Sequence, residues 1–372
     1  TTPPLLRVTI AILSSTEVQV VWTFHHVLLD GWSVARVLSD VFSYHASLVR
    51  GEQPEPVARR PFRDYLSWLS VQDHHQAEQH WRQALTGFDS PTPLPYDHPP
   101  TRTHTTSSTA SSACVLSPQQ STQLREFAHH NGITVNTIIQ GAWAFVLSRY
   151  STHHQVCFGA TVSGRPTDLP GAEDITGIFI NTLPVLVTLT PTATALTWLH
   201  QLQTTQAHTR QYDYASLTQI HTWSELPGGV NLFNSIMVFE NYPINDAAAT
   251  THGLHLRDPH AHETTNYPLT LVVIPDPHLT LQLHYDPTLF DTTTITRITH
   301  HLTHTITTLT THPTTPLEHL DLLTDTERHR ILTTFNDTDH DIPPATVPDL
   351  FEAQVRRTPD ATAVVCGEVL LS

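Results

Sequence analysis

With 372 residues, the chain is too long for one small core, and its length predicts two or three folded units. Hydrophobic residues make up 39% of it, which excludes a wholly disordered protein. The formal charge of -16 opposes binding to the phosphate backbone of nucleic acids. Because we find neither an apolar stretch long enough to cross a bilayer nor a signal segment, we expect a cytoplasmic protein with no nucleic-acid or membrane partner.

The metal-ligating residue types show no metal-site pattern. Three cysteines, Cys114, Cys157 and Cys366, are far apart and odd in number, which argues against a disulfide framework or a paired-cysteine zinc site. The 28 histidines are scattered, often beside threonine. We therefore predict no metal site. The chain opens on Thr1 instead of methionine, which suggests a fragment of a longer protein.

The first predicted elements are two strands and a helix. Residues 5–13 and 17–24 are rich in Val, Ile and Leu and flank a polar turn, which predicts a β-hairpin. The run His25 to Gly31 follows, and apolar residues then recur at helical spacing to about Arg50, with Ser33 as the expected helix cap. The run therefore lies on a strand-to-helix loop.

The chain then alternates between helices and strands. Helices are expected at 61–71 and 74–85, followed by a Pro, Thr and Ser tract at 90–112 that is typical of a linker between lobes. Further strands are expected at 113–116, 156–162, 178–187, 235–239, 269–274 and 279–285, and helices at 117–130, 135–149, 195–212 and 292–309. This interleaving indicates α/β layering. The tail has a charged helical stretch at 324–333, a Pro-rich loop and a helix at 348–357.

The loop from His25 to Gly31 carries candidate chemistry. A neutral imidazole at a strand end, such as that of His26, can act as a general base near neutral pH, and a carboxylate four residues later, Asp30, can fix the loop. The pattern alone is also typical of two core histidines followed by an Asp that caps a helix.

The whole phrase Phe24 to Ser33 resembles the HHxxxDG signature of condensation domains of nonribosomal peptide synthetases. Further phrases similar to that family follow in the family's order: Arg63-Asp64-Tyr65-Leu66-Ser67-Trp68, Ser163-Gly164-Arg165-Pro166, Gly177-Ile178-Phe179-Ile180-Asn181-Thr182-Leu183-Pro184 and Val238-Phe239-Glu240-Asn241-Tyr242-Pro243. The resemblance covers about residues 1–312. It implies an α/β (α+β) fold with two similar sandwich lobes of the chloramphenicol acetyltransferase-like type, forming a V around a central tunnel.

The resemblance also implies a division of the chain. Residues 1–105 would be a partial N-terminal lobe, because the family's domains start upstream of this hairpin, and 106–312 the C-terminal lobe. Residues 313–345 would be a linker, and 346–372 resemble the opening of an adenylation domain. Whether such a fragment is active alone is left open.

The activity that the resemblance implies is attack of an acceptor α-amine on a donor thioester. Both groups would be carried on 4'-phosphopantetheine arms of upstream and downstream peptidyl carrier proteins, with no cofactor bound directly by this chain and an adenylation domain as its neighbour. His26 would face the tunnel and take the ammonium proton or hydrogen-bond the tetrahedral intermediate.

The other site residues have supporting roles in this interpretation. Asp30 would order the loop through a bidentate ion pair with Arg165. The amide of Gly31 would support the thioester carbonyl. His25 is expected to be structural, braced against the lobe, and Asn241 either lines the tunnel or packs in the core.

Three interpretations of the function stay open. The residues after Asp30 and the Val238 phrase resemble amide-forming domains with an L-donor and an L-acceptor, and the paired histidines argue against cyclising members of the family. An epimerisation domain, in which His26 and a glutamate would move an α-proton, is an alternative. A non-catalytic condensation-like module that recruits a partner protein is another.

Overall fold

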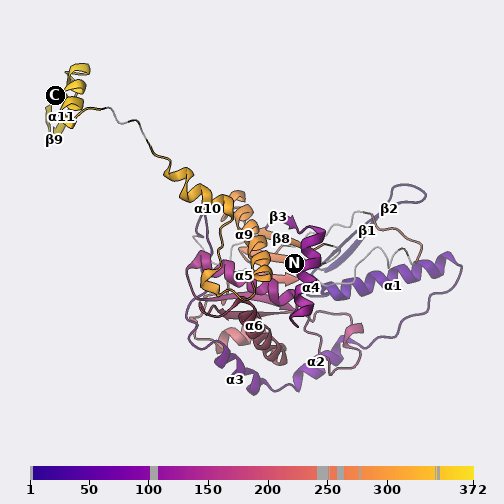
Figure 1. Cartoon of the computed structure of the whole chain (residues 1–372). Coiled ribbons are helices and arrows are strands. Elements are labelled where there is room, and N and C mark those ends of the chain that lie inside the picture. Colours follow the sequence, from indigo (N-terminus) through magenta and orange to yellow (C-terminus); the bar gives the residue numbers. More distant parts are fainter. Residues whose placement is uncertain are drawn as a thin grey trace. The chain divides into compact units, whose positions relative to one another are not determined.

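The structure is a computed structural model that describes residues 3–100, 108–240, 250, 252–257, 264–275, 278–339, 341 and 344–372 (Figure 1). The chain forms two compact units, Thr1–Leu322 and Leu323–Ser372.

The first unit opens with the predicted hairpin and helix. Strands β1 (Leu6–Ile12) and β2 (Val18–Phe24) pair antiparallel, and α1 (Gly31–Val49) follows. Ser33 was wrong as the expected cap, and Asp30, which the alternative interpretation placed there, is correct: its carboxylate caps α1 by accepting the N–H of Ser33. Because Asp30 keeps an extended backbone and the helix begins at Gly31, Ser33 is already the third helical residue.

A six-stranded mixed sheet forms the centre of the first unit, in the order β3-β8-β7-β6-β4-β5. Its strands are β3 (Ala110–Val115), β4 (Gln155–Val162), β5 (Asn181–Thr188), β6 (Ser235–Phe239), β7 (Leu269–Ile274) and β8 (Thr280–Tyr285). Strand β6 runs parallel to both of its neighbours, whereas the other pairs are antiparallel. The sheet confirms the predicted α/β class, since helices alternate with its strands along the chain.

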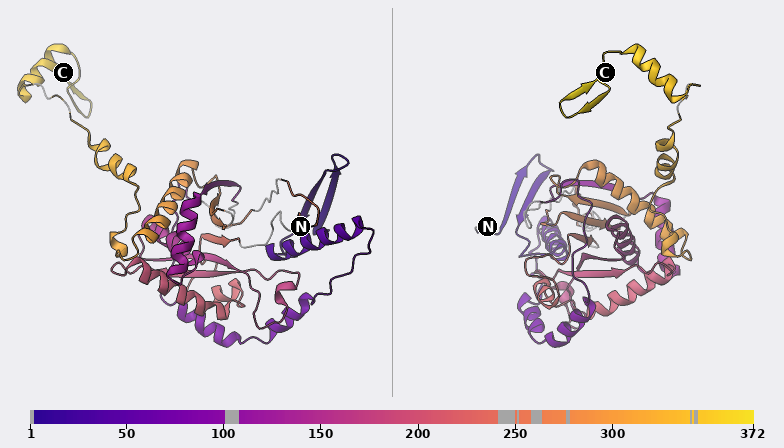
Figure 2. Two further views of the ribbon diagram at one scale, coloured as in Figure 1. Left: turned by 45° about the vertical axis from the view of Figure 1, so that its right-hand side comes forward. Right: turned by 90° about the vertical axis from the view of Figure 1, so that its left-hand side faces the viewer.

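Helices cover both faces of this sheet (Figure 2). One face packs against α4 (Pro118–His130), α5 (Val135–Ser151), α6 (Ala195–Thr209) and α9 (Thr292–Thr311). Strand β4 turns Val156 and Phe158 to this face and Cys157 to the other, as the alternation of side chains in a strand requires. The sheet is therefore the middle layer of a three-layer core.

The opposite face packs against α3 (His74–Ala84) and α7 (Leu217–Trp223). Trp81 of α3 is 1% exposed and shares this core with Ile220 of α7. Helix α2 (Phe62–Ser70) forms a smaller cluster in which Tyr65 packs with Phe179. Helices α2 and α3 thus pack with residues that follow position 105.

Two stretches expected as linkers contribute to the core. In the tract after residue 90, Thr92 is buried and its hydroxyl accepts the N–H of Cys157. Near the end of the first unit, Leu317 and Leu320 are buried in the core that contains α5 and α9. The predicted domain boundaries themselves stay predictions.

The second unit contains the two predicted helices and a hairpin that the sequence pattern did not indicate. Helices α10 (Asp325–Leu332) and α11 (Val347–Arg357) each begin with a capping box, from Thr324 and from Thr346. Strands β9 (Val364–Cys366) and β10 (Val369–Leu371) pair antiparallel. Three-residue strands are too short to show an alternation that could be recognised in the sequence.

Candidate active site

The paired histidines lie on the loop between β2 and α1, as predicted. Both imidazoles are exposed. His25 does not pack in the core of the lobe; its backbone N–H donates to the carbonyl of Leu5 at 2.8 Å, and its Nδ1 accepts the N–H of Val27 at 3.1 Å. A neutral His25 therefore carries its proton on Nε2. The ring of His26 lies 6.2 Å from that of Phe24, between centroids.

Asp30 ends this loop and is 3% exposed. Its Oδ1 accepts the N–H of Ser33 at 2.8 Å, and its Oδ2 accepts the N–H of Phe179 at 3.1 Å. Its own N–H donates to the carbonyl of Gly177 at 3.3 Å. The carboxylate thus caps α1 and also holds the connection between β4 and β5, residues 163–180.

Arg165, the predicted ion-pair partner of Asp30, lies in that β4–β5 connection. Its Nη2 donates to Oδ1 and Oδ2 of Asp30 at 3.1 and 3.3 Å. Its Nη1 donates to the carbonyls of Ala172 and Ile175 at 2.6 and 2.9 Å. Its guanidinium carbon lies 4.1 Å from the ring centroid of Phe179. The expected pairing of two nitrogens with two oxygens is not formed, because Nη1 is occupied by the connection's own carbonyls.

Both members of this ion pair are buried, and burial affects their charges. The side chains of Arg165 and Asp30 are 7% and 4% exposed. Burial lowers the pKa of Arg165, and the neighbouring carboxylate of Asp30 opposes that shift. Arginine stays protonated at neutral pH, so the pair is ionic. A buried pair of this kind is sensitive to loss of either partner, since the remaining charge would have no compensation.

Ser33 and Phe179 belong to this network, and sequence reasoning did not assign them to it. The hydroxyl of Ser33 is fully buried and contacts both Gly177 and Arg165. Phe179 packs between Arg165 and Tyr65, whose ring lies 4.3 Å from its own, between centroids. Ser33 and Phe179 both lie within phrases that resemble the family. A match to a phrase, however, does not show which of its residues contact residues of another phrase.

Helices α1 and α2, and Arg60 just before α2, hold the β4–β5 connection along its length. The indole Nε1 of Trp32 donates to the carbonyl of Glu173 at 3.0 Å, and that of Trp68 donates to Oδ2 of Asp168 at 3.1 Å. Arg60 donates to the carbonyl of Pro170 at 2.8 Å. Trp68 thus anchors the connection that binds the end of the histidine loop.

The remaining predicted site residues are placed as follows. Gly31 is the first residue of α1, where backbone N–H groups have no partner within the helix. Asn241 lies outside the described residues. In the described part of the chain, no group of three or more His, Cys, Asp or Glu side chains could hold a metal ion, and no helix is long and apolar enough to cross a membrane.

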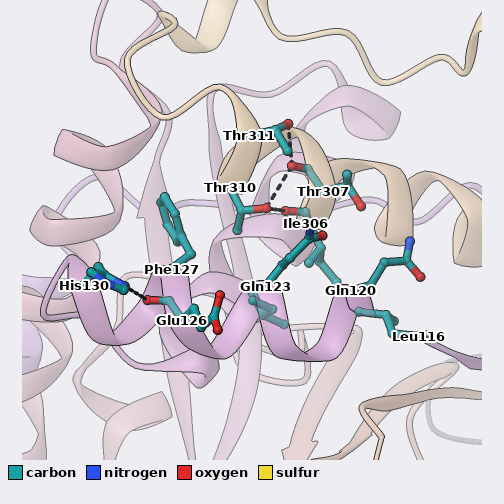
Figure 3. A pocket seen from close by; sticks show the side chains of 11 residues that line it. Leu116, Gln120, Gln123, Glu126, Phe127, His130, Ile306, Thr307, Thr310 and Thr311 are labelled. Atoms are coloured by element: carbon teal, nitrogen blue, oxygen red, sulfur yellow. Dashed lines mark hydrogen bonds between the residues drawn. The ribbon is translucent and has the colours of Figure 1, made fainter. Parts of the chain in front are cut away.

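A separate cavity of about 320 Å³ lies between α4 and α9 and contains none of the predicted site residues (Figure 3). Its lining combines apolar side chains, such as Phe127 and Ile306, with polar ones. The hydroxyls of Thr310 and Thr311 donate to carbonyls of α9 itself, and Nδ1 of His130 bonds to the carbonyl of Glu126. These polar groups are satisfied within their own helices, so the cavity brings no reactive pair together.

Comparison with known proteins assigns the fold and the family. The chain is 40% identical over 366 residues to one component of the linear gramicidin synthase of Brevibacillus parabrevis, and 38% identical over 374 residues to another component of the same synthase. These two alignments cover 98% and 100% of this chain but only 7% and 5% of those proteins. The chain therefore spans a small part of the curated relatives that it matches.

Solved structures share the fold. The X-domain from teicoplanin biosynthesis has a TM-score of 0.72 at 23% identity, covering 86% of this chain and 75% of that one. The four-domain nonribosomal peptide synthetase AB3403 has a TM-score of 0.78 at 17% identity, covering 100% of this chain and 29% of that one. The family model described as "Condensation domain" matches residues 1–332. The chain belongs to the condensation domain family of nonribosomal peptide synthetases.

Proposed function

We propose that this chain forms amide bonds between two thioesters carried on the phosphopantetheine arms of carrier proteins. The observation that carries the proposal is the placement of His26: an exposed imidazole stands on a short loop whose far end is fixed by the buried Asp30–Arg165 pair. Membership of the condensation domain family supports the reaction class. No directly bound cofactor is required by this chemistry.

The proposed reaction moves two protons and exchanges one bond. Nε2 or Nδ1 of neutral His26 accepts the first proton from the acceptor's α-ammonium and releases it to solvent, and the freed amine attacks the carbonyl carbon of the donor thioester. The C–N bond forms, the nitrogen loses its second proton to His26, the C–S bond breaks, and the donor arm leaves as a thiol that takes this second proton. General base action contributes about 10² to 10⁴ in rate, whereas alignment of the two thioesters supplies up to roughly 7–11 kcal/mol of barrier.

The supporting residues position rather than react. Asp30 and Arg165 neutralise one another and fix the first turn of α1, in which Gly31 offers its backbone N–H toward the forming oxyanion. Upstream and downstream peptidyl carrier proteins deliver the substrates, and an adenylation domain follows in the same chain. We assign an L-donor and an L-acceptor from the residues that follow Asp30.

The direct test is amide formation by a synthetase module that contains this chain, with both carriers loaded with L-aminoacyl thioesters. His26→Ala should slow single-turnover amide formation by about 10² to 10⁴. His45→Ala, which removes an exposed histidine of α1, is the matched control and should leave the rate unchanged. An unchanged rate in His26→Ala would contradict the catalytic assignment.

The same module separates condensation from epimerisation. Incubated with a donor carrier alone, the wild-type protein should leave the configuration of an L-aminoacyl thioester unchanged, as chiral chromatography after thioester cleavage would show. Appearance of the D-form without an acceptor would favour the epimerisation alternative. A D-aminoacyl donor that reacts faster than its L-form would overturn the L-donor assignment.

A second candidate function is recruitment of a partner protein without catalysis. The comparison that favours it is a structure of the teicoplanin X-domain in complex with OxyB, which matches this chain with a TM-score of 0.70 at 22% identity. A module that forms no amide with any loaded carrier pair, yet retains a partner domain in size-exclusion chromatography, would support this candidate.

A further inference from the structure

The hydroxyl of Ser33 forms every hydrogen bond that a hydroxyl can form. Its Oγ donates to the carbonyl of Gly177 at 2.8 Å and accepts the N–H of the same residue at 3.0 Å. It also accepts from Nη2 of Arg165 at 3.0 Å. A hydroxyl has one donor and two acceptor sites, and all three are satisfied here at a residue that is 0% exposed.

The three bonds link segments that lie far apart in the sequence. Ser33 stands in the first turn of α1, and Gly177 and Arg165 belong to the β4–β5 connection. Asp30, one turn earlier, binds the same connection through the N–H of Phe179 and the carbonyl of Gly177. Together, the two side chains hold residues 177–179 against the start of α1, directly after the loop that bears His26.

The network leaves little room for rearrangement. Nε of Arg165 is already buried without a hydrogen-bond partner. Loss of the Ser33 hydroxyl would add the N–H of Gly177 to the buried donors without an acceptor. The surrounding groups would then shift to find other partners, and the end of the histidine loop would shift with them.

We propose that Ser33 is a positioning residue for amide formation, setting the place of the His26 loop relative to the β4–β5 connection through its hydroxyl. This inference rests on the function proposed above. A positioning role predicts loss of turnover without loss of carrier binding, because displacement of a reacting group by about 1 Å lowers a rate by about 10².

The test compares Ser33→Thr with Ser33→Val in the full module. The two side chains have nearly the same shape, so the strain of the added methyl group is shared and their ratio isolates the hydroxyl. At saturating loaded carriers, we expect Ser33→Val to turn over at least about tenfold more slowly than Ser33→Thr, with the KM for each carrier within about twofold. A turnover ratio below about twofold would overturn the proposal, as would a loss confined to KM.

A second measurement does not depend on activity. Hydrogen exchange of the Gly177 N–H should be slow in the wild-type protein and in Ser33→Thr, and faster by about tenfold or more in Ser33→Val. Equal exchange in the two variants would overturn the link between Ser33 and Gly177, whether or not amides form. If the proposed function itself is wrong, the wild-type module forms no amide, and this result separates that failure from failure of the Ser33 proposal. Ser39→Ala, at an exposed serine of α1, is the control for both measurements.

Discussion

Arg165 donates from one nitrogen, Nη2, to both carboxylate oxygens of Asp30, at 3.1 and 3.3 Å. Its other terminal nitrogen, Nη1, donates to backbone carbonyls of the β4–β5 connection. The guanidinium therefore joins three parts of the fold: the cap of α1, the residues around Ala172 and the ring of Phe179. Because both side chains are buried, the ion pair holds the end of the loop that carries His25 and His26 in place.

Arg165→Ala should lower the free energy of unfolding by about 3–5 kcal/mol, because it leaves the buried carboxylate of Asp30 without its cation. Urea unfolding followed by tryptophan fluorescence measures the loss. Arg63→Ala, which removes a guanidinium that is 83% exposed, should change stability by less than about 0.5 kcal/mol. The double variant Asp30→Asn/Arg165→Ala should lose less free energy of unfolding than the sum of the losses in Asp30→Asn and Arg165→Ala. Additive losses would show that the two side chains do not interact.

Gly164 precedes that arginine and should tolerate no side chain. Its φ is +60°, and a Cβ built on it would lie 1.8 Å from the carbonyl oxygen of Phe179. Gly132 has a similar φ of +62° but has nothing within 4 Å of a built Cβ. Gly132→Ala should therefore cost about 1 kcal/mol, from backbone strain alone, and Gly164→Ala considerably more.

Thermal unfolding of the two glycine variants gives the comparison, since their backbone strain is shared. Gly164→Ala should also slow amide formation, because the displaced carbonyl belongs to Phe179, whose N–H binds Asp30. If both variants melt at the same temperature, the close approach of Gly164 to Phe179 does not constrain the fold.

The acceptor role of Nδ1 in His25 predicts different outcomes for two substitutions. His25→Asn places a carbonyl oxygen near the N–H of Val27 and should keep most of the amide-forming activity. His25→Ala removes the acceptor and should lower activity by about tenfold, less than His26→Ala. Single-turnover rates at 25 °C, with far-UV circular dichroism to verify folding, distinguish the variants. Equal losses in His25→Asn and His25→Ala would mean that the ring itself, and not its acceptor atom, is required.

Much of the fold was predictable because its elements carry clear periodicity. The hairpin β1–β2, helix α1 and most strands of the six-stranded sheet follow runs of apolar residues at strand or helix spacing. Strand β3 begins at Ala110, three residues before the expected 113–116, because Ser111 and Ser112 interrupt the apolar pattern. Helix α7 has seven residues with only Ile220 buried, so no periodic pattern marks it. The sequence pattern offered both Asp30 and Ser33 as the cap of α1, because both are good capping residues and the sequence does not show which one precedes the first turn.

The candidate site was only partly predictable for a different reason. The Asp30–Arg165 contact joins residues 135 positions apart, and it was inferred from family phrases. The bonds of Ser33 to Gly177, and the packing of Tyr65 on Phe179, depend on how α1 and α2 meet the β4–β5 connection. Local sequence patterns hold no information about such contacts.

Asp213 provides a prediction about pH. Burial raises its pKa to about 6 from the ordinary 3.8, although Arg210 opposes the shift. Between these two values the folded state holds more protons than the unfolded state, so the free energy of unfolding falls as pH rises through this window and levels off above about pH 7. Asp213→Asn abolishes this dependence, and at pH 8 it should be more stable than the wild-type protein by about 1–2 kcal/mol, with allowance for partial exposure.

Urea unfolding of the wild-type protein and of Asp213→Asn at pH 5, 6, 7 and 8 tests this prediction, and the difference between the two should widen with pH. Asp89→Asn, at an exposed aspartate, should show no such widening and serves as the control. A wild-type protein that loses stability relative to Asp213→Asn as pH falls would require the opposite shift, which would mean that a positive partner outweighs the burial of this carboxyl group.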